Sequence, residues 1–272
     1  MRRVRQTAKE LREHYEVERE LADRLRQASR EERRELYGVV YAERSARIPH
    51  HPLVRAAADP EARGRAVEPQ ARLIRRFVGR ADAFLEVGAG DAAVAVAVAP
   101  HVARATAVDV TDALAPARGP GNFEFLAFDG FELPLPAASV DFVYSNDVVE
   151  HLHPDDLDDH LHAILRVLRP GGRYLCVTPN RLSGPHDVSR HFGDTPQGFH
   201  LREYTLGELA DALTAAGFRS VGTVTSVSGR AVRRIPGLRL ARGLERALEP
   251  LPHRLRRSAA RPLAAVKLVA VA

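Results

Sequence analysis

A short apolar run that leads directly into a glycine turn constrains the fold of this chain more than any other segment. Residues 83–87 (AFLEV) have the length of a buried strand, and Gly88-Ala89-Gly90 follows at once. Glycine adopts positive φ angles at little cost, so the sequence predicts a tight turn. Residues 91–99 then predict a helix, because a strand leaving the turn could not present free backbone N–H groups to a ligand. The three elements together predict a nucleotide-sized crevice.

The residues around the turn leave two nucleotide classes open. Residues 88–93 satisfy the loose dinucleotide pattern G-x-G-x-x-G/A, which favours NAD and an oxidoreductase. Glu86, however, precedes the first glycine by two residues, where dehydrogenases usually carry an apolar residue. Asp109 ends the predicted strand 105–109, and a carboxylate there can accept both ribose hydroxyls in either class.

The third predicted strand covers residues 123–127. The stretch that follows it distinguishes between the two nucleotide classes. Residues 128–136 read FDGFELPLP, and residues 138–152 read ASVDFVYSNDVVEHL. Together with Glu86-x-Gly88-x-Gly90, they closely resemble class I S-adenosylmethionine-dependent methyltransferases of the small-molecule type, including those that act on ubiquinone and menaquinone precursors. That family often has a third glycine where this chain has Ala92. The position serves helix packing, and alanine is the next smallest residue.

The resemblance implies a Rossmann-like α/β fold whose seven-stranded sheet is mostly parallel with an antiparallel last strand. It also implies S-adenosylmethionine as cofactor and S-adenosylhomocysteine as product. In the family, the aspartate at Asp129 accepts from the adenine amino group and the N–H of Gly130 meets a ring nitrogen. The full set of implied cofactor contacts is Glu86, Gly88, Gly90, Asp109, Val110, Asp129, Gly130 and Asn146.

The rest of the chain supplies the remaining elements and the flanking segments. We expect a helix over 69–78, strands at 140–145 and 173–178 around a helix at 154–168, and a helix capped by Thr205. Residues 218–227 and 264–272 predict two strands that pair antiparallel. Two capped helices, starting after Thr7 and Ser29, form an N-terminal unit (1–58) that is either a packing cap or a lid over the acceptor. The cofactor-binding domain is then 59–272.

A basic segment, residues 230–262, is predicted as an insertion before the last strand. It holds ten arginines against two glutamates, and Leu240, Leu244, Leu248 and Leu251 recur at helical spacing. Nucleic-acid modules usually interleave aromatic residues with such charge, and this segment has none. We therefore expect no nucleic-acid partner, and a peripheral contact with anionic membrane surfaces instead.

The chemistry expected of the site is in-line methyl transfer, with O-methylation of a small molecule, saccharide or lipid-linked acceptor. An oxygen acceptor needs its proton removed, and histidine is the usual base near neutral pH. His151, just beyond the fourth strand, is the first candidate, and His186 and His191 lie in the long loop 179–202. A non-catalytic scaffold that binds the same cofactor is the other alternative.

Metal ligands and membrane spans are not expected. The adjacent side chains of His50 and His51 point apart, and the spacing of His186, Asp187 and His191 is not a strong ligand signature. The single cysteine, Cys176, suits a reducing compartment, and no apolar run has the length of a membrane span or a signal peptide. We therefore expect a cytoplasmic protein, peripheral to the membrane at most.

Overall fold

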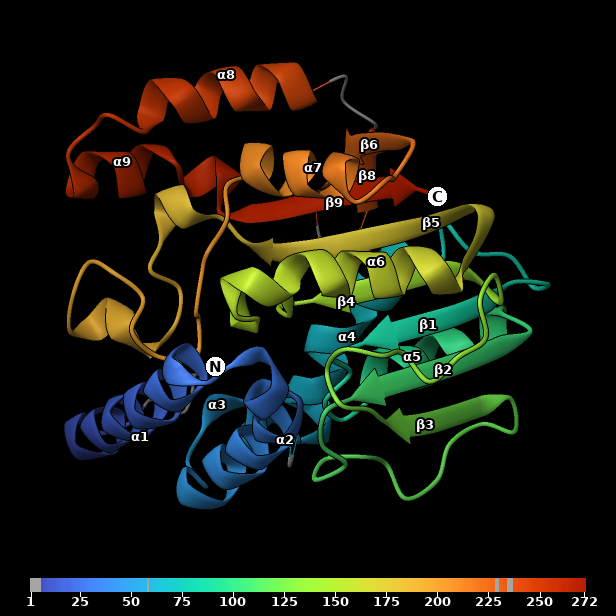
Figure 1. Ribbon diagram of the computed structural model, residues 1–272, viewed down its shortest axis with the longest axis horizontal. Coiled ribbons are helices and arrows are strands. Elements are labelled where there is room, and N and C mark those ends of the chain that lie inside the picture. Colours follow the sequence, from blue (N-terminus) through green and yellow to red (C-terminus); the bar gives the residue numbers. More distant parts are fainter. Residues whose placement is uncertain (1–5, 58, 228–229, 234–236) are drawn as a thin grey trace.

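A mixed seven-stranded sheet organises the residues that the computed structural model describes, which are 6–57, 59–227, 230–233 and 237–272. Its strand order is β3-β2-β1-β4-β5-β9-β6, and β1 to β5 run parallel while β9 runs antiparallel to both of its neighbours (Figure 1). The predicted Rossmann-like class I methyltransferase fold is confirmed. The strands are β1 (Ala83–Val87), β2 (Arg104–Asp109), β3 (Phe123–Ala127), β4 (Val140–Asn146), β5 (Leu168–Pro179), β6 (Ser220–Thr223) and β9 (Ala265–Val271).

Helices cover both faces of the sheet and bury an apolar core on each. On one face lie α6 (Leu157–Val167) and α7 (Leu206–Ala215), and on the other α4 (Pro60–Ile74) and α5 (Ala93–Val98). The stripe on α6 that contains Leu161 and Ile164 is fully buried, as its spacing predicts. The described residues also form short 3₁₀ helices, which are η1 (Ala99–His101), η2 (Val149–His151), η3 (Pro154–Asp156), η4 (Arg181–Ser183), η5 (Val188–His191) and η6 (Arg261–Leu263).

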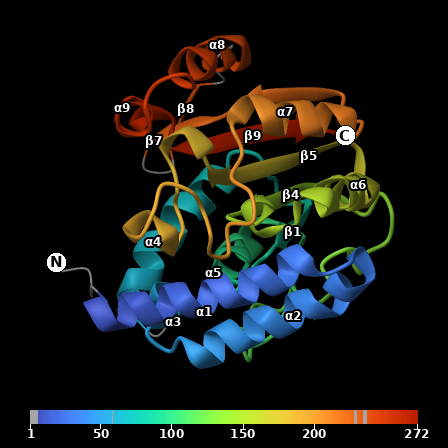
Figure 2. The same ribbon diagram turned by 60° about the vertical axis from the view of Figure 1, so that its left-hand side comes forward.

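The N-terminal unit is a helical hairpin at the carboxyl edge of the sheet. Helices α1 (Ala8–Gln27) and α2 (Arg30–Arg47) begin at the predicted capping boxes of Thr7 and Ser29, and the short α3 (Pro52–Ala57) follows. Figures 1 and 2 show the hairpin beside the ends of β1 and β2, which are the edge where parallel α/β sheets bind ligands.

Three element boundaries differ from the prediction. The helix before β1 spans Pro60–Ile74 rather than 69–78, because Pro69 lies inside α4 without ending it. The strand β5 begins at Leu168, so the residues after α6 join the sheet directly. The predicted strand over 218–227 is two strands: β6 pairs with β9, whereas β7 (Thr225–Val227) pairs with β8 (Arg230–Arg233) in a separate ribbon.

The predicted insertion before the last strand (230–262) begins with the strand β8 and is helical over most of residues 237–262. Helices α8 (Leu238–Leu248) and α9 (His253–Ala259) lie beyond α7 and connect to β9. Leu248 packs on Leu182 of the long loop, which fixes α8 against the domain. Among the described residues, no helix is long and apolar enough to cross a membrane.

Candidate active site

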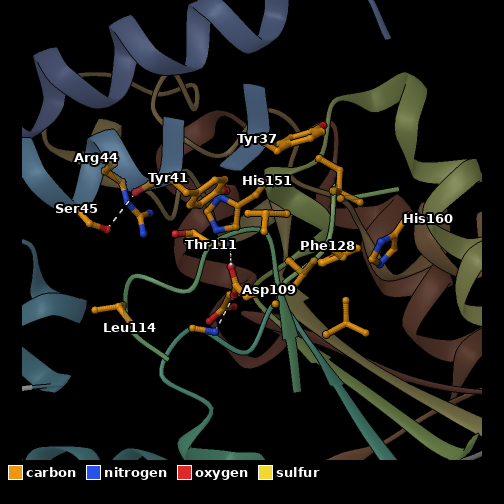
Figure 3. A pocket seen from close by; sticks show the side chains of 18 residues that line it. Tyr37, Tyr41, Arg44, Ser45, Asp109, Thr111, Leu114, Phe128, His151 and His160 are labelled. Carbon is orange, nitrogen blue, oxygen red and sulfur yellow. Dashed lines mark hydrogen bonds between the residues drawn. The ribbon is translucent and has the colours of Figure 1, made fainter. Parts of the chain in front are cut away.

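A cavity lies between the glycine turn and the N-terminal hairpin, at the ends of β1, β2 and β4 (Figure 3). Its floor comes from the turn and the loops after β2 and β3, and its roof comes from α2. Apolar side chains dominate it, and its acidic groups are Asp109 and Asp147. The lining consists of Tyr37, Tyr41, Arg44, Ser45, Val87, Gly88, Gly90, Asp109, Val110, Thr111, Leu114, Phe128, Gly130, Asp147, Val148, His151, Leu152 and His160. We call this the first cavity.

The glycine turn is built by backbone constraints that only glycine meets easily. Gly88 has a φ of 68°, and a Cβ there would collide with the side chain of Val148. The N–H of Gly90 donates to Asp109 Oδ2 at 2.7 Å, so the turn is tied to the end of β2. Ala92 also takes the left-handed conformation, with a φ of 50°. The position of the family's third glycine is therefore a backbone requirement rather than only a packing one, and alanine fills it at a cost of about 1–2 kcal/mol.

Glu86 supports the turn from inside the protein. Its carboxyl group is buried and accepts the N–H of Ala95 at 2.8 Å, which caps the start of α5. Burial raises the pKa of Glu86 to about 8, so this side chain is largely protonated at neutral pH.

Helix α2 supplies the roof through one stripe of its surface. Tyr37, Tyr41, Arg44 and Ser45 recur at helical spacing and all line the first cavity. The close approach depends on Gly38, because a Cβ there would lie 2.8 Å from the carbonyl oxygen of Val110. The guanidinium of Arg44 is held over the rings of Tyr41 and Phe199, at 4.9 and 5.3 Å from their centroids.

A second, more polar cavity adjoins the first. It lies between α1, the turn before α3 and the long loop 179–202, and its volume is about 380 Å³. Histidines gather around it from four parts of the chain, together with two arginines and buried acids. Its lining is Gln6, Leu11, His14, Glu18, Arg44, His51, Pro52, Asp147, His151, Pro179, His186, Asp187, Val188, Arg190, His191, Phe199 and His200.

Arg44, Asp147 and His151 line both cavities and therefore mark their junction. Asp147 follows β4 with a φ of 55°, a conformation that non-glycine residues adopt rarely and that clusters at functional sites. Its N–H donates to the carbonyl of Val177 at 2.9 Å, which holds the strained turn on the neighbouring strand β5. The structure thus fixes one carboxylate, one guanidinium and one imidazole between the two spaces.

The protonation state of His151 follows from its contacts. Its Nδ1 lies 2.8 Å from the carbonyl oxygen of Phe199, which can only accept, so Nδ1 carries the proton and Nε2 has the free lone pair. Burial, together with the positive charge of His200, lowers the pKa of His151 to about 3. The imidazole is therefore neutral at pH 7.

His200 is the charged partner in this pair. Burial alone would lower its pKa, but the hydrogen bond from Nδ1 to Glu203, at 2.7 Å, and the nearby Glu150 raise it to about 9. The rings of His151 and His200 meet edge to face, with centroids 4.9 Å apart. Glu150 is fully buried, and burial together with the charge of Asp147 raises its pKa to about 8.

The structure brings most of the residues predicted from the sequence to the two cavities. Gly88, Gly90, Asp109, Val110 and Gly130 line the first cavity. His151, His186 and His191 line the second, where His186 Nε2 is 2.9 Å from Ser183 Oγ and 3.1 Å from the carbonyl of Asn180.

Three predicted cofactor contacts are not among the described residues that line the first cavity. Glu86 lies beneath the turn, as described above. Asp129 accepts the N–H groups of Phe131 and Glu132 through Oδ1, and its Oδ2 pairs with Arg34 of α2 at 3.1 Å. Asn146 donates to Asp147 Oδ2 at 2.8 Å. Contacts of these three with a cofactor stay predictions.

The sequence did not single out several residues that the structure places here. Tyr41 and Arg44 come from α2. The sequence pattern predicts that this face of the helix is amphipathic, but it does not predict that the face covers a cavity. His160 was part of a predicted helix; it is buried, and its Nε2 has no hydrogen-bond partner within the described part of the chain. Burial lowers its pKa to about 4, so it lines the first cavity as a neutral ring.

Comparisons with known proteins agree with this architecture. Residues 85–176 match the family model described as a methyltransferase domain. A probable S-adenosylmethionine-dependent methyltransferase of Mycolicibacterium smegmatis is 38% identical over 157 residues, which are 56% of this chain and 57% of that protein. The chain thus matches little more than half the length of this relative.

Solved structures extend the likeness to the fold. A Haloferax volcanii protein described as a methyltransferase, in complex with the Trm112 methyltransferase activator, aligns with a TM-score of 0.56 at 19% identity, over 80% of this chain and 96% of that one. A Haemonchus contortus phosphoethanolamine N-methyltransferase in complex with S-adenosylhomocysteine aligns with a TM-score of 0.52 at 19% identity, over 75% of this chain and 52% of that one.

Proposed function

We propose that this chain is a class I S-adenosylmethionine-dependent methyltransferase that methylates an oxygen of a small polar acceptor, such as a saccharide or a lipid-linked intermediate. The observation that carries the proposal is the position of His151. It stands at the junction of an apolar cavity and a polar one, with Nε2 available to accept a proton.

The first cavity fits the cofactor of this family. S-adenosylmethionine supplies an electrophilic methyl group on a sulfonium centre. Asp109 has used two of its roughly four acceptor positions, on the N–H groups of Gly90 and Thr111, so it would also accept ribose hydroxyls. Val110 and Phe128 offer apolar surfaces for adenine, and the unpartnered Nε2 of His160 offers a polar atom for its edge. Arg44 would pair with the methionine carboxylate.

The chain's own residues then have two tasks. The walls of both cavities align the donor with the acceptor and exclude water, which is the main requirement of an in-line displacement. His151 Nε2 would accept the hydroxyl proton as the bond between the acceptor oxygen and the methyl group forms. His200 lies beside His151 and stays charged because its Nδ1 donates to Glu203. Burial keeps the His151 ring neutral and its lone pair free at physiological pH. Because the low pKa also makes His151 a weak base, the proton would move to Nε2 only as the acceptor oxygen takes the methyl group.

The polarity of the second cavity supports a hydroxylated or anionic acceptor. Arg44 and Arg190 line it together with several histidines, and such side chains suit sugar hydroxyls, phosphates or carboxylates. A lipid-linked form is supported separately by α8 and α9. Leu240, Leu244 and Leu255 are exposed at 72%, 45% and 61% on helices rich in arginine, which is the pattern of a surface that lies on anionic lipid.

The test measures S-adenosylhomocysteine formation with a panel of polar acceptors. We expect His151→Asn to lower kcat at saturating cofactor at least about a hundredfold while the affinity for S-adenosylhomocysteine changes little. His162→Asn is the matched control, because His162 is exposed on α6 and bonds its own helix through Nδ1. A loss of less than about tenfold in His151→Asn would remove this residue as the base.

The membrane contact has its own experiment. Co-sedimentation with vesicles of anionic phospholipid should fall in the double variant Leu240→Ser, Leu244→Ser. Val39→Ser is the control, because Val39 is similarly exposed, at 52%, but lies on α2. Equal sedimentation of both variants and the wild type would contradict a role for α8.

A further inference from the structure

Three potential metal ligands converge in the N-terminal hairpin, on the wall of the second cavity. His14 and Glu18 lie one turn apart on α1, and His51 comes from the segment between α2 and α3. His14 Nε2 is 3.0 Å from Glu18 Oε1, and His51 Nε2 is 3.6 Å from the same oxygen. The three ligand atoms all lie within 4.8 Å of one another.

The histidine on α1 is oriented but unsatisfied. The side chain of Gln6 bonds His14 Nδ1 at about 3.1–3.2 Å, which fixes the ring and directs Nε2 toward Glu18. His14 is 5% exposed, and within the described residues its Nε2 forms no hydrogen bond of good geometry despite its closeness to the carboxylate. His14 Nε2 therefore faces the Glu18 carboxylate alone, and an ion bound between the two would give both groups better-directed contacts.

The charge around the three residues favours a cation. Glu18 is 4% exposed, and Asp187 of the long loop lies close to it beside Gly198. Glu18 Oε2 and Asp187 Oδ2 each lie 2.8 Å from the point that a Cβ on Gly198 would occupy. Asp187 is satisfied by Ser189 and by the N–H of Gly198, so it would act as a neighbouring charge rather than as a required ligand.

We propose that His14, Glu18 and His51 bind one divalent transition-metal ion, with zinc as the best match to two imidazoles and one carboxylate. Ligand atoms around a tetrahedral zinc ion stand about 3.3 Å apart, given bond lengths of about 2.0–2.2 Å. The observed separations therefore need only small side-chain movements. An open coordination position would face the second cavity and take water or an oxygen of a bound acceptor.

This site is independent of the methyl-transfer proposal. Its residues lie outside the first cavity, and ion binding can be measured without cofactor or acceptor. Arg44 lines the same cavity, and its positive charge disfavours a bound cation. The affinity for the metal ion therefore depends on the negative charges of Glu18 and Asp187 outweighing that of Arg44.

The experiment titrates the metal-free chain with Co²⁺, whose tetrahedral complexes absorb strongly in the visible range, and measures bound Zn²⁺ by mass spectrometry after dialysis. We expect one equivalent of either ion in the wild type, and an affinity at least about a hundredfold lower in Glu18→Gln and in His51→Asn. The control His162→Asn should bind like the wild type, because it alters an exposed pair of the same i, i+4 type.

Circular dichroism and S-adenosylhomocysteine binding check that each variant folds. Two results would overturn the proposal. If the wild type binds no stoichiometric ion, then His14, Glu18 and His51 only interact with one another within the hairpin. Binding that survives in Glu18→Gln and His51→Asn would place the ion on other histidines of the second cavity.

Discussion

The buried ion pair between Arg33 and Asp156 decides whether α2 is a permanent wall of the first cavity or a lid. Arg33 Nε and Nη2 donate to the two carboxylate oxygens at 2.7 and 2.6 Å, and Tyr37 donates to the same carboxylate at 2.9 Å. The side chains are 4% and 3% exposed. This contact joins α2 to the start of α6, directly beside the cavity roof.

The size of its effect follows from burial. Asp156→Ala leaves the guanidinium buried without its counter-ion, and breaking such a pair costs about 3–5 kcal/mol. The double variant Arg33→Met, Asp156→Leu removes both charges, so it should recover most of the loss. Because domains are stable by only about 5–15 kcal/mol, Asp156→Ala should shift urea unfolding strongly and raise the Kd for S-adenosylhomocysteine.

The molecule provides its own control for this experiment. Arg30 and Asp159 join the same two elements, but their side chains are 47% and 40% exposed. Solvent screens such a pair, so Asp159→Ala should change stability and affinity little. Equal losses in Asp156→Ala and Asp159→Ala would refute the argument from burial. An Asp156→Ala variant that is destabilised but binds S-adenosylhomocysteine like the wild type would refute α2 as a necessary wall.

Three further predictions concern the same site. Gly38→Val should push α2 off the carbonyl of Val110 and weaken S-adenosylhomocysteine binding at least tenfold by calorimetry. Gly88→Ala places a Cβ against Val148 at a φ of 68°, so binding should be lost while circular dichroism still reports a folded chain. The pKa of His200 is raised from 6.5 to about 9, so its contribution to stability is complete below pH 6.5 and disappears as the pH rises through 9. His200→Gln should therefore flatten the fall in urea-unfolding free energy over that interval, and an unchanged slope would contradict the assigned charge.

Local signals in the sequence predicted the elements well. The capping boxes of Thr7, Ser29 and Thr205 each place the observed start of a helix, because the hydrogen bonds that define them span only three residues. The first, second and fourth strands were found because their apolar runs are buried on both faces of a parallel sheet. The glycine turn was found because its backbone angles demand glycine.

Contacts between segments that are far apart in the sequence could not be predicted from such local signals. The pairing of Asp129 with Arg34 joins residues on β3's loop and α2. The approach of His51 to Glu18 depends on the fold of the hairpin, whereas adjacency along the chain predicts only that the side chains of His50 and His51 diverge. His50 indeed bonds the carbonyl of Glu10 instead. The direction of a side chain across a helix hairpin is set by packing, not by local propensity.

Under the proposed O-methylation, with His151 as the base, the residues that meet at the junction of the two cavities also affect acceptor selectivity. Arg44 reaches the junction from the hairpin, His151 from the segment after β4, and Asp147 through a strained backbone held by β5. His200 and Phe199, which set the charge and tautomer of His151, belong to the long loop. A change in any of these three segments would therefore alter the proton acceptor as well as the shape of the second cavity. Substitutions that adapt the loop to a new acceptor must keep the Phe199 carbonyl on His151 Nδ1, because otherwise the ring can present an N–H rather than a lone pair to the acceptor oxygen.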